Sequence, residues 1–309
     1  MKYFSFLFLF VFSLGCFAQN EEEPARIVKS VVLDSLVITA NPLMAEDFIR
    51  EIEKDTLFYR AFADLKFYEY LAENKIYTYD KKGRKDAFIY RKVDHVIRDS
   101  VHISNVLLTK DSGDVFKRNG DFELFTVQML SYLFNMGGEI NLSNAKEYDE
   151  KSDGVEGKLK EKLKLLIARP GTRIDGIPFI SGKTAIFEPD MRQYYDYTFH
   201  HATYRDTMNV YRFECILKKD LKSNKEDDLI INELTTIFDK KTFNIVARYI
   251  DVSYKSMLAD CDIRMNFELA YVGRKLLTEV VEYDGYWDIP FRKKEKVSFK
   301  VVHDFSKTK

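Results

Sequence analysis

The last third of the chain alternates apolar and polar residues over seven consecutive segments, between residues 194 and 305. Side chains of a strand point alternately to the two faces of a sheet, so each segment has one apolar face. Short polar turns such as DKKT (239–242) connect them. The pattern predicts a wide antiparallel sheet whose apolar face packs against helices, a second sheet or a ligand. The segment DIRMNFEL shows it most clearly, with apolar residues Ile263, Met265, Phe267 and Leu269.

Two earlier segments have the spacing of helices instead. Residues 41–55 (NPLMAEDFIREIEKD) repeat apolar residues at intervals of three, four and seven, and residues 120–138 contain a stripe that includes Phe125 and Met129. We expect both helices to lie on the apolar face of the sheet. The predicted fold is therefore mainly β, a β-rich α+β protein with a strongly curved antiparallel sheet or incomplete β-barrel and covering helices.

The N-terminus indicates export. Lys2 precedes the apolar run YFSFLFLFVFSLGCFA, which is too short to span a bilayer comfortably. Residues 1–18 are therefore predicted to be a secretory signal peptide. Cleavage after Ala18 competes with a lipobox-like site that would leave Cys16 lipidated, and Ser13 in place of the usual leucine favours Ala18. Either cleavage predicts a mature protein in the periplasm or at the outer-membrane periphery, anchored by lipid only if Cys16 is modified.

The rest of the chain divides into three parts. Residues 19–30 are polar and predict a flexible leader, residues 31–60 predict a strand followed by a helix, and residues 61–309 predict a single antiparallel domain resembling a half-barrel. No second apolar run of membrane length follows the signal peptide. Hydrophobic residues make up 46 % and aromatic residues 15 % of the chain, which suits a large sheet with a sizeable core.

Charge and cysteine content narrow the function. The formal net charge of −1 gives no basis for an electrostatic grip on nucleic acid. Once the signal peptide is removed, Cys215 and Cys261 remain, and in an oxidising compartment they could form one disulfide or stay free. We expect no cofactor and no transmembrane segment in the mature protein.

No motif in the sequence indicates catalysis or a metal site. HExxH, a cysteine pair at zinc spacing and Gly-x-Ser-x-Gly are all missing from the sequence. His200 and His201 are adjacent in a predicted strand, so their side chains point to opposite faces and do not converge on one metal ion. The expected protein is not an enzyme. A hydrolase with carboxylates and His200 in a cleft remains a third, disfavoured interpretation.

Several segments resemble the closing strands of exported bacterial proteins related to the outer-membrane lipoprotein-sorting carriers, the LolA-like group. They are INELTTIFDKKTFNIVARY, DIRMNFEL and YDGYWDIPFRKKEKVSFKV, the last with a Gly-x-Trp-Asp-x-Pro element from Gly285 to Pro290. The resemblance covers roughly residues 190–305. It implies an incomplete β-barrel whose open side is covered by helices and whose apolar interior holds lipid acyl chains.

The resemblance makes a lipid or lipoprotein acyl-chain carrier of the envelope the preferred function. The alternative is an outer-membrane interaction or assembly protein with a closed core and no ligand, in which the first strand pairs with a partner's sheet. Trp287 is interpreted as a plug or turn residue that closes one end of the sheet, with a binding hot spot as the alternative. The candidate ligand-lining residues, which could equally form a closed core, are Phe125, Met129, Ile263, Met265, Phe267 and Leu269.

Overall fold

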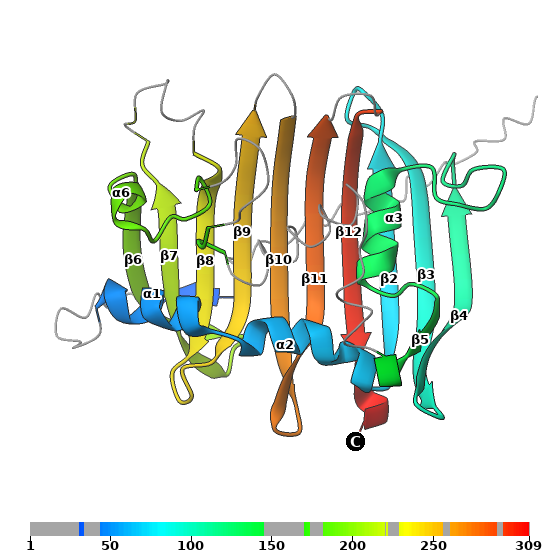
Figure 1. Cartoon of the computed structure of the whole chain (residues 1–309), viewed down its shortest axis with the longest axis horizontal. Coiled ribbons are helices and arrows are strands. Elements are labelled where there is room, and N and C mark those ends of the chain that lie inside the picture. The colour runs from blue at the N-terminus through cyan, green and yellow to red at the C-terminus, as the bar shows by residue number, and fades with distance from the viewer. Residues whose placement is uncertain are drawn as a thin grey trace, which may run out of the picture.

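The structure is a computed structural model that describes residues 31–33, 44–144, 170–173, 182–219, 221, 229–255, 260–288 and 293–308. The predicted signal peptide (1–18), Cys16 and the predicted leader (19–30) lie outside the described residues. Within the described part, one antiparallel sheet of twelve strands dominates (Figure 1).

All neighbouring strands of this sheet are antiparallel, in the order β1-β6-β7-β8-β9-β10-β11-β12-β2-β3-β4-β5. The sheet is open and uncurled, with β1 and β5 as its edges. The strands are β1 (Val31–Leu33), β2 (Tyr70–Tyr79), β3 (Lys85–Arg98), β4 (Val101–Ser112), β5 (Gly138–Asn141), β6 (Tyr195–Tyr204), β7 (Met208–Leu217), β8 (Ile231–Asp239), β9 (Ile245–Lys255), β10 (Asp260–Val272), β11 (Lys275–Asp288) and β12 (Glu295–Asp304).

Three helices cross the same face of the sheet (Figure 1). The α1 helix contacts β6, α2 contacts β9 and β11, and α3 contacts β12. The longer helices are α1 (Ala45–Lys54), α2 (Leu57–Ala63) and α3 (Phe125–Leu133), and the short ones are η2 (Asp64–Phe67), η3 (Leu142–Asn144), α6 (Pro189–Arg192) and η4 (Ser306–Thr308). Among the described residues, no helix has the length and apolar character needed to cross a membrane.

The predicted fold class is confirmed: the protein is mainly β, with one antiparallel sheet and helices on its apolar face. The seven alternating segments of the last third form β6 to β12. The expected shape of the sheet, strongly curved or an incomplete β-barrel, differs from the one observed, because the described strands form an open, uncurled sheet with separate edges at β1 and β5. Helix α2 and strand β5 were not predicted. Both are short, and neither has enough residues to show a clear period.

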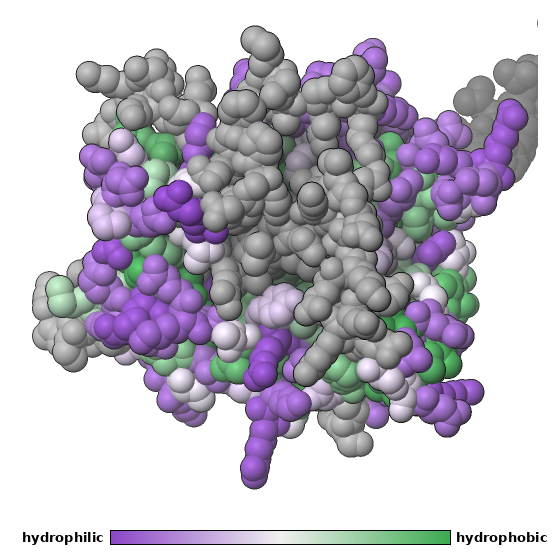
Figure 2. All heavy atoms as spheres, in the orientation of Figure 1, coloured by the Kyte–Doolittle hydropathy of each residue, from purple (hydrophilic) through white to green (hydrophobic). Residues whose placement is uncertain are grey.

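Helix α1 packs against strands β6 and β7 through the aromatic ring of Phe48. Phe48 is fully buried, and its ring lies 5.0 Å from Phe199 and 5.1 Å from Phe213, measured between ring centroids. The opposite side of α1 is exposed and includes charged residues such as Arg50 and Glu53. Figure 2 shows a hydrophilic patch at the lower left, in the region of this helix. The helix is therefore amphipathic, as its spacing predicts.

The two remaining cysteines are buried and free. Cys215 lies on β7 and Cys261 on β10, and β8 and β9 separate these strands. Burial raises the pKa of both thiols, that of Cys261 to about 12. The open question from the sequence is therefore answered in favour of free thiols.

Candidate functional site

The described residues contain a pocket of about 760 Å³ at the α3 end of the sheet. Its walls come from the end of α2 and η2, the 116–122 turn, and the segment 128–140 that includes most of α3 and the start of β5. Strands β2, β3, β4 and β12 contribute its floor, through Tyr70, Arg91, His102 and His303. This volume lies within the range of about 300–1,000 Å³ that is usual for small-molecule sites.

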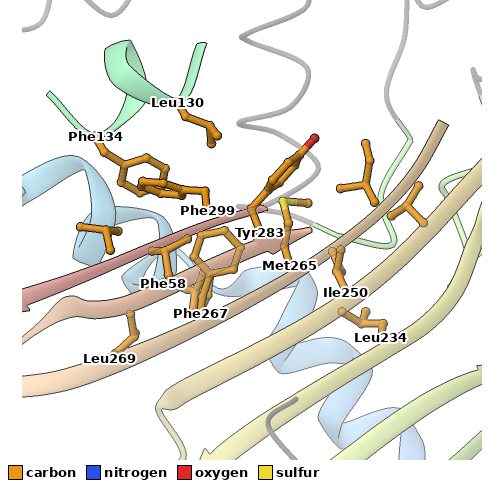
Figure 3. Packing of buried hydrophobic residues seen from close by; sticks show 14 of the residues in the cluster. Phe58, Leu130, Phe134, Leu234, Ile250, Met265, Phe267, Leu269, Tyr283 and Phe299 are labelled. Carbon is orange, nitrogen blue, oxygen red and sulfur yellow. The ribbon is translucent and has the colours of Figure 1, made fainter. Parts of the chain in front are cut away.

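Helix α3 is fixed over the sheet at both ends. At its C-terminal end, the Phe134 ring packs 4.9 Å from Phe299 of β12, between ring centroids, as Figure 3 shows. At its N-terminal end, the Glu295 carboxylate accepts hydrogen bonds from the backbone N–H groups of Phe125 (2.9 Å) and Thr126 (2.8 Å). Contacts with β12 therefore hold α3, one wall of the pocket, in its place on the sheet.

Arg91 brings a positive charge into an aromatic part of the pocket. Its guanidinium lies 5.2 Å from the Phe122 ring centroid and 5.8 Å from that of Phe116, and Nη1 donates to the Met136 carbonyl at 3.2 Å. Burial lowers the pKa of Arg91, and the nearby Asp111 charge opposes that shift. Its Nε is buried and has no hydrogen-bond partner in the described structure. An incompletely satisfied cation among aromatic rings suits an anionic ligand atom.

Three of the five histidines gather beside this pocket. The Tyr70 ring stacks on His95 at 4.2 Å and meets His303 edge-on at 5.0 Å, between ring centroids. His95 Nδ1 lies 2.9 Å from His102 Nε2, and His102 Nδ1 donates to the Lys66 carbonyl at 2.8 Å. Burial lowers the pKa of all three, to about 4 for His303 and about 2 for His95, so they are neutral at pH 7.

These contacts fix the tautomers. A carbonyl only accepts, so His102 carries its proton on Nδ1 and its Nε2 accepts from His95 Nδ1–H. The proton of His303 likewise lies on Nδ1, which donates to the Thr278 carbonyl at 2.8 Å. The Nε2 atoms of His95 and His303 are therefore acceptors, both buried and without a partner among the residues that the structure describes. Among the described residues, no three His, Cys, Asp or Glu side chains are grouped so that they could hold a metal ion.

The residues predicted to line a ligand cavity lie elsewhere. Figure 3 shows three of them, Met265, Phe267 and Leu269, on β10, with the Phe267 ring near Phe58 of α2, 6.0 Å between ring centroids. Ile263 also lies on β10, Met129 is buried on α3, and Phe125 is half-buried. None of the six lines the pocket described here. Their role as a ligand wall stays a prediction.

Trp287 is half-buried near the end of β11. Its Nε1 donates to the Tyr283 hydroxyl at 2.6 Å, and the Tyr283 ring lies across Gly285, where a Cβ atom would overlap it. This explains physically why glycine precedes tryptophan in the Gly-x-Trp element. The interpretation of Trp287 as a plug or turn residue stays a prediction.

The pocket residues that sequence reasoning missed did leave a signal. Along β3, Ala87, Ile89 and Val93 are buried on the inner face, and Arg91 and His95 occupy the same phase of the alternation. Asn74 does so on β2 and His303 on β12. A polar residue at an apolar position of a strand must find a polar partner or a ligand, so such positions are the ones to single out.

Comparisons with known proteins give structural likenesses alone. No protein-family model and no curated protein matches the chain. One similar solved structure is described as a "putative outer membrane lipoprotein-sorting protein domain" of Vibrio parahaemolyticus. It is 7 % identical, with a TM-score of 0.25, over 84 % of this chain and 91 % of that one. Another is a DUF1329 family protein of Desulfovibrio piger, 10 % identical, with a TM-score of 0.24, over 85 % of this chain and 92 % of that one.

The first likeness is to a protein whose description names the class that the sequence resembles. Both TM-scores are far below 0.5, so neither likeness indicates a ligand or an activity for this chain.

Proposed function

We propose that this protein is an exported, non-catalytic protein of the cell envelope that binds a lipid or lipoprotein acyl chain in the pocket beneath α3. The observation that carries the proposal is the half-buried Arg91 guanidinium, which lies beside the stacked rings of Phe116 and Phe122 in a pocket of about 760 Å³. Aromatic walls with one half-buried cation suit an amphipathic anion, whose chain is apolar and whose head is negative.

The walls supply the driving force for the apolar part. Phe62, Leu133 and Ile140 line the pocket together with the Phe116 and Phe122 rings. Each methylene taken out of water contributes about 0.8 kcal/mol, so a chain of ten carbons gains several kcal/mol even when burial is partial. A carrier in an aqueous compartment needs this shelter, because a free acyl chain there is strongly disfavoured.

The charges select the head group. Lys66 and Lys117 line the pocket with Arg91, so three cationic residues line it together with two acidic ones, Asp121 and Glu139. A carboxylate or phosphate near Arg91 would satisfy the guanidinium, and a charge-assisted hydrogen bond of this kind contributes about 1.5–3 kcal/mol. The export part of the proposal is supported by the signal-peptide pattern of the N-terminus.

One observation favours the alternative, an outer-membrane interaction or assembly protein. Within the described residues, β5 pairs with β4 only from Val101 to Ser104, so the rest of β4 has a neighbour on its β3 side alone. Val106, Leu107 and Leu108 follow on this edge and are exposed. An open apolar edge is a template for strand addition by another chain.

Uptake of a fluorescent anionic acyl probe tests the proposal. The purified mature protein is titrated with a fluorescent fatty acid, and native mass spectrometry checks for lipid that co-purifies. Arg91→Met is expected to weaken the affinity by about 10–100-fold, the equivalent of one lost charge-assisted contact. Arg98→Met, on the same strand but exposed, is the matched control and should bind as the wild type does. Absence of uptake, or equal affinity of the wild type and Arg91→Met, would contradict the proposal.

A further inference from the structure

Several polar side chains on the sheet beside the pocket have buried atoms without a hydrogen-bond partner in the described structure. The register places Asn74 of β2 directly opposite Arg91 of β3, and Val301 of β12 on its other side. His303 of β12 lies opposite Ala72, two residues before Asn74. Diagonal neighbours in a sheet are about 7–8 Å apart, so these side chains form one patch.

Each member of this patch has an unsatisfied hydrogen-bonding atom. Asn74 is fully buried, and among the described residues neither its Oδ1 nor its Nδ2 has a hydrogen-bond partner. The Nε atom of Arg91 and the Nε2 atom of His303 are also buried and have no partner there. A buried polar group without a partner costs about 1–3 kcal/mol, and native proteins tolerate few of them. Four such atoms in one patch, next to a pocket that Arg91 and His303 line, indicate a polar ligand group.

The patch requires both donors and acceptors from its ligand. Arg91 Nε is a donor that favours a negative oxygen. His303 Nε2 is an acceptor, because its Nδ1 proton is committed to the Thr278 carbonyl. Asn74 offers one of each kind. A simple carboxylate offers acceptors alone, so it would leave His303 Nε2 unpaired.

We propose, on the basis of the acyl-binding function above, that the ligand carries a hydroxylated phosphodiester head group of the phosphoglycerol type. The phosphate oxygen accepts from Arg91, and a hydroxyl of the head group donates to His303 Nε2. A hydroxyl can both donate and accept a hydrogen bond, so it can pair with either the oxygen or the NH2 group of the Asn74 carboxamide. An ammonium head group would bring a second positive charge close to Arg91, so a hydroxyl is the better donor here.

Two lipids that differ only in the hydroxyls test this assignment. Dihexanoyl phosphatidylglycerol and dihexanoyl phosphatidylpropanol carry the same chains and the same single phosphate charge, and both are used as monomers in isothermal titration calorimetry. The wild type is expected to bind phosphatidylglycerol about tenfold more tightly, the ratio that corresponds to one net hydrogen bond. Equal affinities, or tighter binding of dihexanoyl phosphatidylethanolamine, would overturn the hydroxyl assignment.

Variants test whether the residues of the patch cause the preference for phosphatidylglycerol. His303→Phe is expected to bind both lipids with similar affinity, whereas His303→Gln keeps an acceptor and should retain most of the preference. Asn74→Leu, a second variant of similar volume, should also reduce the ratio of the two affinities. His200→Phe, on the half-exposed side of β6, is the matched control and should leave the ratio unchanged. A preference that survives in both His303→Phe and Asn74→Leu would overturn the proposal.

The experiment separates this inference from the function on which it rests. If both lipids bind equally, the hydroxyl assignment fails and acyl binding stands. If neither lipid binds, both fail. Deacylated glycerophosphoglycerol distinguishes a lipid from a soluble polyol phosphate: we expect it to bind at least tenfold more weakly than the lipid, because it lacks the buried chains. Equal affinity for the deacylated compound would overturn the acyl-chain function and assign the patch to a soluble ligand.

Discussion

Glu295, the first residue of β12, caps a helix that lies 169 residues before it in the chain. Its Oε2 accepts hydrogen bonds from the backbone N–H (2.8 Å) and the hydroxyl (2.6 Å) of Thr126 in the first turn of α3. The local N-cap residue, Leu124, has no side chain that can cap. A strand carboxylate therefore satisfies the helix N-terminus, where the helix dipole also favours a negative charge.

Removal of this cap is expected to destabilise the protein and loosen the pocket. Glu295→Ala removes the carboxylate that accepts from the Phe125 and Thr126 N–H groups, so the free energy of unfolding should fall by about 2–3 kcal/mol. Glu295→Gln keeps acceptor capacity but loses the charge, and its loss should be smaller. Urea denaturation measures both, with Glu123→Gln, exposed just before α3, as control. A Glu295→Ala variant as stable as the wild type would show that the cap contributes nothing.

The buried histidines predict a loss of stability at acidic pH. Burial lowers the folded pKa of His303 to about 4, below its unfolded value of about 6.5. Below pH 6.5, His303 becomes protonated in the unfolded chain but stays neutral in the folded chain. The stability present above pH 6.5 is therefore lost as the pH falls toward 4. The slope is about 1 kcal/mol per pH unit for each such histidine, and His95 adds to it.

Urea denaturation at pH 7 and pH 5 measures this effect. His303→Gln removes one titrating group, so its free energy of unfolding should fall by about 1–2 kcal/mol less than that of the wild type between the two pH values. The same pH dependence in His303→Gln and the wild type would show that His303 is not the group that titrates.

The free cysteines predict a protein without reactive thiols while it is folded. Cys215 is fully buried, and burial raises the pKa of both thiols, so neither forms a thiolate at neutral pH. A thiol reagent should label neither residue at pH 8 and both in urea, as mass spectrometry of the labelled protein measures. Lack of labelling in urea, with recovery after reduction, would instead mean that the two form a disulfide.

The sequence indicates the sheet well because alternation is a local signal. Each segment from 194 to 305 contains its own apolar face, and the strands that result need only pair with their neighbours in the chain. The placement of β12 beside β2 is not local: it joins the end of the chain to its first third. That pairing brings His303 next to Tyr70 and Glu295 below α3, so the pocket could not be located from periodicity.

The same difference explains why the sequence pattern indicates β10 as a candidate ligand wall and does not indicate the pocket. Regular alternation marks the residues of a core, and Met265 and Phe267 are buried at 4 % exposure. Polar residues at apolar positions of the alternation, such as Asn74 and Arg91, lower the stability of the fold, so they indicate positions that serve ligand binding instead. Regular alternation therefore indicates the apolar face of the sheet, whereas polar residues that interrupt it indicate the candidate site.

Phe267 distinguishes a packed core from a ligand wall. Its ring contacts Phe58 of α2 at 6.0 Å between centroids, and α2 in turn contacts β9 and β11. If this contact is core packing, Phe267→Ala leaves a cavity and lowers the free energy of unfolding by about 3–5 kcal/mol. The affinity for the acyl probe should then stay unchanged, because the pocket beneath α3 is lined by other residues. Phe67→Ala, at a phenylalanine that is 47 % exposed, is the control and should cost little stability. Loss of probe binding in Phe267→Ala at unchanged stability would instead make the β10 face the ligand wall, as the sequence alone predicts, and would place the acyl chain on the central strands.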